Sequence, residues 1–296
     1  MKLRQIGEDA LLAKLISLFP ADRRVVAGSG DDAAIVRGDS PRDLLVLKTD
    51  CVVRGIHFEG NASPEAVGWK AMMRPLSDFA AVSAVPEFAL ITLIVNRDME
   101  VSWVAGVYRG LNRAACKFNV SIVGGETSSI AGPAAISVSV TGTVEKDRWV
   151  SRRGGRPGDR IFVTGRLGNS IRGRHLRFIP RIEESRWLTA HFRIHAMIDL
   201  SDGLGADLPR LAAASRVGFI INSVALPLSA GATVDNAISD GEDYELLFTV
   251  SGRDAKRLPS QWRKKFPGTR LTDIGSLIPR TSTRGSKLKG GYIHFQ

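Results

Sequence analysis

The sequence predicts a mixed α/β (α+β) fold built from two domains. Short runs rich in Val and Ile alternate with segments in which apolar residues recur at helical spacing, a mixture typical of sheets covered by helices. Hydrophobic residues make up 44% of the 296 residues, enough to bury a sizeable core. The Gly- and Pro-rich segment SRRGGRPGDR, residues 151–160, follows an expected strand and indicates a domain boundary near residue 150.

The first half of the chain is expected to hold three helices and four strands. An amphipathic pattern predicts a helix at 3–18, and apolar residues near helical spacing predict a second helix at 64–81. A third helix is expected at 101–118. Runs rich in Val and Ile predict strands at 44–47, 89–95, 120–123 and 135–144.

The second half continues the same alternation. Apolar runs predict strands at 161–164, 218–221 and 245–250, and helical patterns predict helices at 206–214 and 253–266. The basic segment 169–186 shows no clear period. The tail at 281–291 is expected to be a loop before a short final strand, YIHF.

The net charge of +11 leaves two interpretations open, a solvated basic surface and a nucleic-acid surface. The arginines do not interleave with aromatic residues, and no zinc knuckle or RNP-like motif occurs, so nucleic-acid binding is disfavoured. A basic field also favours small polyphosphate ligands.

The location predicted from the sequence is the cytoplasm. Cys51 and Cys116 form neither a CxxC pair nor a metal-ligand spacing, which favours a reducing compartment. No apolar run approaches the roughly 20 residues of a membrane span, and the N-terminal segment has no signal-peptide core. A membrane partner is therefore not expected.

The stretch GSGDDAAIV, residues 28–36, fits the pattern GxGxxG/A, and Asp50 follows at about the spacing of a dinucleotide-binding fingerprint. The context argues against that site, because only AAIV separates the loop from the turn-forming RGDSPRD, where the fingerprint needs a helix. Bare aspartates would also repel a pyrophosphate. The sequence contains no GxxxxGK[ST] loop and no HRD or DFG kinase signature.

Carboxylates gather at the ends of apolar segments, where ligands bind in layered folds. Each has an ordinary alternative: Ser201–Asp202 could cap a helix, Asp78 could be solvated, and Asp243 could belong to a turn. Together they suit Mg²⁺ carrying ATP, because hard cations prefer oxygen ligands and a bound ion reverses the local electrostatics of an acidic loop. Most of the acids concerned lie at such ends, whereas Asp78 is expected on a helix. They are Asp31, Asp32, Asp50, Asp78, Glu126, Asp199, Asp202, Glu242 and Asp243.

An ordered set of motifs resembles the thiamine-monophosphate kinases, within the superfamily that includes aminoimidazole ribonucleotide synthetase and selenophosphate synthetase. The resemblance runs from about residue 26 to 250, with a weaker echo at GGYIHF. Each motif is weak alone, but the ordered set is highly specific. The motifs are GSGDDAAIV, KTDCVVRGIHF, GWKAMMRPLSDFAAVSA, GGETS, RRGGRPGD, VTGRLGNS, IDLSDGL and GEDYELLFTV.

The resemblance implies ATP-dependent phosphorylation of thiamine monophosphate to thiamine diphosphate. It implies an aminoimidazole ribonucleotide synthetase-like fold, with an N-terminal Mg-ATP-binding and dimerisation domain at 1–148 whose mixed sheet pairs in a homodimer. A C-terminal α/β domain at 149–296 would cover nucleotide and substrate. ATP is the implied co-substrate, several Mg²⁺ ions are implied cofactors, and thiamine monophosphate is the implied acceptor.

The resemblance also implies residue roles. The positions that match its metal ligands are Asp32, Thr49, Asp50, Asp78, Glu126, Asp199 and Asp202. The positions that match ATP contacts are Gly125, Glu126, Arg152 and Ser201, and those that match substrate contacts are His57, Glu242 and Tyr292. Glu126 replaces the usual Asp of a GGDT motif, so its carboxylate lies about one methylene further out. The stretch between Ser170 and Asp199 is shorter than is usual in the family.

The chemistry agrees with a sequence that shows no Ser/His/Asp or Cys/His constellation. The acceptor is a phosphate monoester whose second pKa is near ~6, so it is mostly a dianion at neutral pH and needs no general base. We therefore expect direct in-line attack, helped by positioning and by charge neutralisation. Two ordinary interpretations stay open: His57 could be a packed histidine, and Arg152 could belong to a solvated basic loop.

Two alternatives remain from the sequence, after two named members of the superfamily are set aside. A selenophosphate synthetase would carry a reactive cysteine or selenocysteine before residue 51, and the hydrogenase-maturation relative would end in cysteine; this chain has neither. Another ATP-using member of the superfamily could act on a different acceptor. A non-catalytic relative could bind RNA through the basic surface, although an acidic cleft would give it no advantage.

Overall fold

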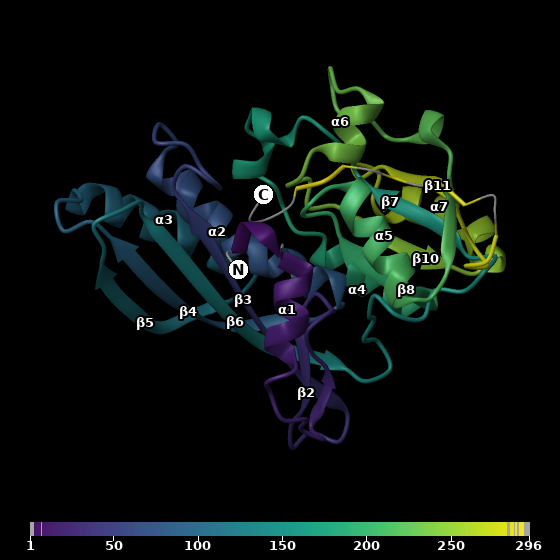
Figure 1. Cartoon of the computed structure of the whole chain (residues 1–296), viewed down its shortest axis with the longest axis horizontal. Helices are drawn as coiled ribbons and strands as arrows, with labels where there is room; N and C mark the ends of the chain where they lie inside the picture. The colour runs from purple at the N-terminus through teal and green to yellow at the C-terminus, as the bar shows by residue number, and fades with distance from the viewer. Residues whose placement is uncertain (1–2, 7, 283–284, 287, 289, 293–296) are drawn as a thin grey trace.

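The computed structural model describes residues 3–6, 8–282, 285–286, 288 and 290–292. It contains two sheets side by side, each with its own helices (Figure 1). The mixed α/β class expected from the sequence is confirmed. In the described part of the chain, no helix is both long and apolar enough to cross a bilayer.

The first sheet is mixed and has the strand order β1-β2-β3-β6-β4-β5. All its neighbours are antiparallel except β4 and β5, which are parallel because α3 crosses over between them. Its strands are β1 (Val25–Ala27), β2 (Ala34–Arg37), β3 (Asp43–Val53), β4 (Val85–Val95), β5 (Ser121–Ser129) and β6 (Ala135–Glu145).

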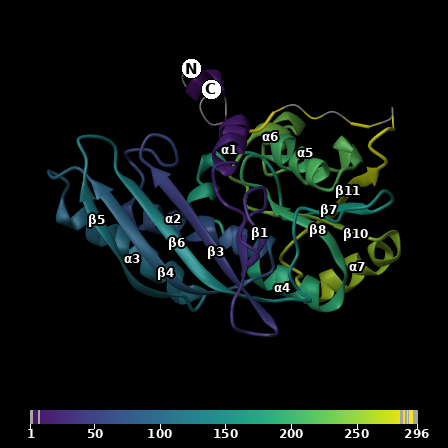
Figure 2. The ribbon, with the colours of Figure 1, turned by 60° about the horizontal axis from the view of Figure 1, so that its bottom comes forward.

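Two helices, α2 (Pro64–Ala81) and α3 (Val101–Lys117), cover only one face of this sheet (Figure 2). Along β3 the side chains alternate accordingly: Leu44 and Val46 are buried under the helices, while Leu45 and Leu47 are exposed on the opposite face. We call the helix-covered side the inner face and the bare side the outer face.

The helix α2 begins and packs for identifiable reasons. Ser63 caps it by accepting a hydrogen bond from the Ala66 amide, and Pro64 occupies its first turn. The helix approaches α3 so closely that a Cβ at Gly68 would lie 1.9 Å from the Val107 carbonyl oxygen. This close contact fixes the position of α2, and with it the positions of its polar residues.

The second sheet is antiparallel throughout, with the order β8-β10-β7-β11-β9. Its strands are β7 (Arg160–Thr164), β8 (Ile194–Asp199), β9 (Gly218–Ile221), β10 (Leu246–Val250) and β11 (Leu271–Ile278). The accompanying helices are α4 (Ile182–His191), α5 (Leu204–Ala214), α6 (Val234–Ser239) and α7 (Gly252–Lys265). Single turns of 3-10 helix span Ser170–Arg172, Arg174–Leu176 and Ser223–Ala225.

One hydrophobic core runs from the first sheet into the second. Phe79 of α2 belongs to the same buried cluster as Phe162 of β7 and Phe248 of β10, while a separate cluster around Leu208 fills the other face of the second sheet. The helix α2 is therefore sandwiched between the two sheets, and its polar residues face the edge where the sheets meet.

Most of the expected elements exist, with changed ends. The helix expected at 64–81 is α2, whereas the helix expected at 3–18 is divided into a 3-10 turn, Leu3–Gln5, and α1 (Glu8–Ile16). Several short elements had no separate prediction: β1, β2, β8, β11, α4 and α6. The expected final strand YIHF lies outside the described residues apart from Tyr292.

Candidate active site

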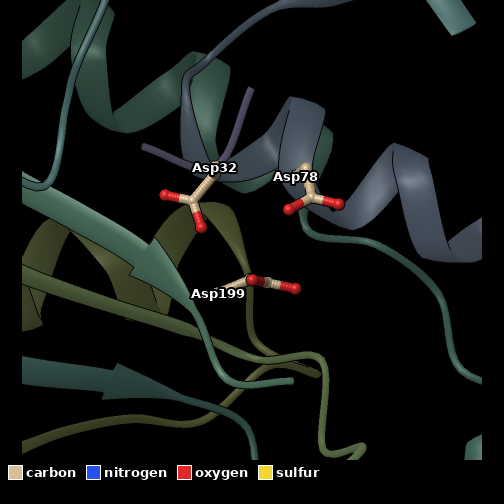
Figure 3. Close-up of side chains that lie close together, drawn as sticks. All are labelled: Asp32, Asp78 and Asp199. Carbon is tan, nitrogen blue, oxygen red and sulfur yellow. The ribbon is translucent and has the colours of Figure 1, made fainter. Parts of the chain in front are cut away.

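Three carboxylates distant in the sequence converge where the two sheets meet (Figure 3). Asp32 lies in the loop between β1 and β2, Asp78 on α2, and Asp199 at the end of β8. One carboxylate oxygen from each lies within 4.8 Å of the others, and all three residues are buried. Carboxylates this close repel one another, so the arrangement favours a bound cation or a shared proton.

Neighbouring side chains fix the direction of these acids. The Ser77 hydroxyl donates a 2.6 Å hydrogen bond to Asp199 Oδ2. The Arg152 guanidinium grips Asp32 through two bonds, Nε to Oδ2 at 3.2 Å and Nη2 to Oδ1 at 2.8 Å. The Arg152 amide donates to Asp31 Oδ1 at 3.0 Å. The opening GSGDD loop is thus anchored to the segment that precedes β7.

The inner face of β3 adds one cation and one further carboxylate. Lys48 and Asp50 lie two residues apart, so both point toward α2. Lys48 Nζ lies 3.0 Å from Asp78 Oδ1 and 3.8 Å from Asp50 Oδ2. It also donates to the main-chain oxygen of Asp32 at 3.1 Å. Lys48 is therefore a built-in counter-charge inside the acidic cluster.

Burial and mutual repulsion perturb the cluster strongly. Burial, with Asp50 and Asp199 nearby, raises the pKa of Asp78 well above its usual value, although Lys48 opposes the change. Burial and the charge of Asp32 likewise raise the pKa of Asp199. Protons and a divalent cation therefore compete for the same oxygens, and the donor set of hard carboxylates fits Mg²⁺.

A cavity of about 250 Å³ adjoins this cluster. It brings together five of the positions matched to ligand contacts, namely His57, Ser201, Asp202, Glu242 and Tyr292. The remaining lining residues are Ile56, Arg74, Ile171, Asp240, Gly241 and Tyr244. The cavity therefore unites the three positions matched to substrate contacts.

The wall of the cavity is held from behind by a buried lysine. Lys70 on α2 is fully buried, and its Nζ lies 2.6 Å from Glu242 Oε1 and 2.5 Å from the main-chain oxygen of His57. The Tyr244 hydroxyl also donates to Glu242 Oε1, at 3.3 Å. His57 Nδ1 accepts a 3.0 Å bond from the Val53 amide. Lys70 thereby couples the two sides of the pocket.

Arg74 connects the cavity with the acidic cluster. It lies one turn after Lys70 on α2, and its Nη2 is 3.6 Å from Asp50 Oδ1. Its side chain is only 16% exposed. A guanidinium at this position can contact phosphate oxygens of a ligand that extends from the cavity toward the carboxylates.

Some predicted positions are not brought to the cluster. The Thr49 side chain points to the outer face of β3, where its hydroxyl contacts Ser137 at 3.3 Å and Ser139 at 3.0 Å. Glu126 pairs with Thr92 of β4 in register and is exposed on the same outer face.

Strand order gives the distance of Glu126 from the site. Because β5 is three strands away from β3 in the sheet, Glu126 and its neighbour Gly125 lie roughly 14 Å from β3. Asp202 lines the cavity, but its carboxylate is paired with Arg210. These positions do not join the three buried carboxylates within one chain.

Sequence reasoning assigned Arg152 but missed three other cations of the site. Lys48, Lys70 and Arg74 received no role, although each is a charged residue at a position where the local pattern requires an inward-facing side chain. Lys48 continues the buried alternation of β3, and Lys70 and Arg74 interrupt the apolar run GWKAMMRPL on α2. A charge on the core-facing side of an amphipathic element was the available signal.

Comparisons with known proteins identify the family of this chain. A family model described as AIR synthase related protein, N-terminal domain, matches residues 30–144. A thiamine-monophosphate kinase of Rhodopirellula baltica is 38% identical over 292 residues, covering 93% of this chain and 90% of the relative. The thiamine-monophosphate kinase of Bacillus subtilis is 32% identical, covering 92% and 94%. The solved structure of AaThiL complexed with AMPPCP and TMP superposes with a TM-score of 0.84 at 33% identity and covers 99% of both chains.

Proposed function

The chain belongs to the thiamine-monophosphate kinase family, and on that premise we propose that its buried carboxylates and adjoining cavity transfer the γ-phosphoryl group of ATP to thiamine monophosphate. The product is thiamine diphosphate, and the enzyme is a phosphotransferase. The observation that carries the proposal is the convergence of Asp32, Asp78 and Asp199 beside the cavity. A relative complexed with AMPPCP, an ATP analogue, and with TMP supports the choice of ligands.

We assign Asp32, Asp50, Asp78 and Asp199 to the binding of Mg²⁺. When bound there, Mg²⁺ neutralises phosphate oxygens and so lowers the repulsion between two anionic reactants. The residues of the chain prepare this function: Ser77 and Arg152 orient the carboxylates, and Lys48 limits their mutual repulsion. Ser201 and Arg152 are assigned to the nucleotide, and Asp202 to a further metal contact that requires its release from Arg210.

The substrate end of the site is assigned to His57, Glu242 and Tyr292, which line one cavity. Lys70 and Tyr244 hold the Glu242 carboxylate in place. No general base is assigned, because the acceptor phosphate is already a dianion above its second pKa near ~6. The chain instead binds and aligns the two phosphates for in-line attack, and Arg74 lies between the cavity and the acids.

A homodimer is part of the proposal. The outer face of the first sheet exposes Leu45, Leu47, Phe88 and Leu90, an apolar patch that a second copy would cover. Glu126 lies on this same face, so its assignment to metal and nucleotide, with that of Gly125, requires the site of the partner copy. Thr49 is likewise assigned as a ligand on this face and not through the buried cluster.

The division of labour follows the two sheets. We assign residues 1–148 to Mg-ATP binding and dimerisation, and residues 149–296 to covering nucleotide and substrate. Strands β1–β6 and α2 supply most of the carboxylates, whereas β8 supplies Asp199 and the segment before β10 supplies Glu242. A cytoplasmic location, where ATP is available, belongs to the same proposal.

The test is a coupled assay with ATP, Mg²⁺ and thiamine monophosphate, run beside free thiamine and other phosphorylated acceptors. We expect turnover that needs Mg²⁺ and prefers thiamine monophosphate. Efficient transfer to a different phosphorylated acceptor would assign the chain to another activity of the superfamily. RNA binding with steep salt dependence and no ATP turnover would contradict the kinase assignment.

A further inference from the structure

A second cavity, of about 960 Å³, lies in the C-terminal half and shares no lining residue with the substrate cavity. We call it the arginine cavity. Its walls come from the end of β7, the start of β11, α7 and the loops beside them. Five guanidinium groups line it, those of Arg166, Arg174, Arg181, Arg263 and Arg270.

The charge of the arginine cavity is strongly unbalanced. Among the described residues that line it, Glu245 is the only carboxylate. Arg181 forms a bidentate ion pair with it, in which Nε donates to Oε2 at 2.7 Å and Nη2 donates to Oε1 at 2.8 Å. Arg174 is paired with the buried Asp243. Two of the five arginines are therefore neutralised by buried acids.

In the described part of the chain, no neighbouring acid compensates the charge of the other three arginines. Within the described part of the chain, no ion pair joins Arg166, Arg263 or Arg270 to a carboxylate. Arg166 makes one hydrogen bond, to the Leu228 carbonyl oxygen at 3.0 Å. Three such guanidinium groups around one hollow create a local field that attracts an anion.

The hollow continues into a neighbouring one. A depression of about 430 Å³ shares Arg174, Ser229 and Ala230 with the arginine cavity and adds Arg172 and Arg177. Neither Arg172 nor Arg177 has a carboxylate partner among the described residues. The positive lining is thus longer than a single phosphate group, and it could contact two or more phosphates at once.

The wall of the arginine cavity is rigid where the paired arginines lie. Glu245 is 4% exposed, and it accepts a further 2.8 Å hydrogen bond from the Thr164 hydroxyl. A Cβ at Gly165 would lie 1.9 Å from Glu245 Oε1, so the backbone passes directly over the carboxylate. The Glu245 carboxylate is therefore already fully engaged by protein groups. The arginines without an acidic partner determine which ligands the cavity attracts.

We propose that the arginine cavity binds a small molecule that carries a diphosphate or longer phosphate chain. Guanidinium groups match phosphate oxygens in forked geometry and stay charged at any physiological pH. The volume lies in the range of small-molecule sites. The apolar part of the lining, with Trp262 of α7 and Phe266 directly after that helix, offers a surface beside the charges for the rest of the ligand.

Binding of inorganic pyrophosphate, measured by isothermal titration calorimetry on the full chain without Mg²⁺ and with chelator, tests the proposal. The test variant is Arg263→Ala/Arg270→Ala, which removes two exposed, unpaired arginines from the lining. The matched control is Arg253→Ala/Arg280→Ala, which removes the same charge from exposed positions outside the cavity.

We expect the Kd for pyrophosphate to rise at least tenfold in the test variant and less than twofold in the control. A second titration with ADP tests whether the ligand also carries a nucleoside. If ADP binds more tightly than pyrophosphate and this binding is lost in the test variant, the apolar surface binds a nucleoside. If the two ligands bind equally, the cavity recognises the diphosphate alone. Absence of pyrophosphate binding to the unaltered chain, or equal weakening in both double variants, would overturn the proposal. Kinase activity of both variants is expected to be unchanged, so the outcome is independent of the assigned function.

Discussion

The Ser77 hydroxyl donates a 2.6 Å hydrogen bond to Asp199 Oδ2 across 122 positions of sequence. This bond joins α2 of the first sheet to the end of β8 in the second, directly beside Asp78. The positions of the buried carboxylates therefore depend on how the two sheets pack against each other. A shift of one sheet relative to the other would separate the acids that the proposed metal ions need.

Replacing Asp78 by Asn should abolish turnover while the fold persists. The change removes a proposed metal ligand, and metal ions supply several kcal/mol of charge stabilisation, so kcat should fall at least about a hundredfold. The pKa of Asp78 is already raised by burial and by its acidic neighbours, so a neutral amide should be tolerated without loss of Tm. Asp98→Asn, at an exposed position, is the control. Normal kcat in Asp78→Asn, measured by the coupled assay, would remove Asp78 from the site.

The metal-free protein should become more stable as the pH falls from 8 to 6. Burial and neighbouring acids raise the pKa of Asp78 and of Asp199 above the value of an unfolded aspartate. The folded state then binds more protons than the unfolded state, so stability decreases as pH rises through the folded pKa. Thermal melts with chelator at several pH values measure this slope, and Asp78→Asn should reduce it.

The Mg²⁺ requirement of the enzyme should also depend on pH. A carboxylate must lose its proton before it binds a metal ion, so the Mg²⁺ concentration for half-maximal activity should increase as the pH is lowered toward 6. Mg²⁺ titrations of activity at fixed, saturating ATP measure the effect. A half-saturation value that does not change with pH would show that the raised carboxyl groups are not the ligands.

Much of the candidate site was predictable, and the missing parts have physical reasons. The pattern of acids in the sequence indicated Mg²⁺ with ATP, and the family resemblance then matched Asp32, Asp78 and Asp199 to metal ligands. No strand was predicted for the segment IHAMID, because six residues carry no measurable period. The alternation of β3 indicated that Lys48 faces inward, but nothing local identified the acids from other segments that it meets there.

The outer-face positions were beyond sequence reasoning for a different reason. Glu126 follows two glycines at the end of an expected strand, like other candidate ligands, but its strand lies at the edge of the sheet. Pattern analysis predicts which residues end a strand, not the order of strands in the sheet. That order is what places Glu126 far from Asp78 within one chain.

Replacing Arg74 should affect the acceptor more than the fold. Its Nη2 is 3.6 Å from Asp50 Oδ1, and the side chain lines the substrate cavity. Loss of a guanidinium that contacts a phosphate typically removes a charge-assisted bond worth roughly 1.5–3 kcal/mol, so Arg74→Met should raise KM for thiamine monophosphate about tenfold or more. Arg97→Met, at a position that is 89% exposed, is the control. Unchanged KM and kcat would contradict a role in binding.

The pair of Lys70 and Glu242 should behave as a unit. Lys70 is fully buried, and its Nζ lies 2.6 Å from Glu242 Oε1. Lys70→Met should lower the free energy of unfolding by about 2 kcal/mol and raise KM, because the carboxylate loses the group that holds it. The double variant Lys70→Met/Glu242→Gln should be more stable than the sum of the single effects, as urea denaturation would show. Strict additivity would mean that the two side chains are not coupled.

Subunit mixing can decide whether Glu126 acts across a dimer. Glu126 and the exposed residues Leu47 and Phe88 share the outer face, so Glu126 can serve a metal site only if a docked partner copy brings part of its own site to this face. We expect Asp78→Asn and Glu126→Gln to be inactive separately. When the two variants are co-expressed with different tags, a hybrid dimer contains one site with both residues intact.

Random pairing makes half of the dimers hybrid, and one of two sites in each is complete, so about a quarter of unaltered activity should return. If Glu126 acts within its own chain, both sites of every hybrid carry one defect and no activity returns. A tagged pair with the same single variant in both chains controls for incomplete inactivation. Phe88→Glu on the outer face should prevent the recovery, because a buried charge opposes the apolar contact on which pairing depends.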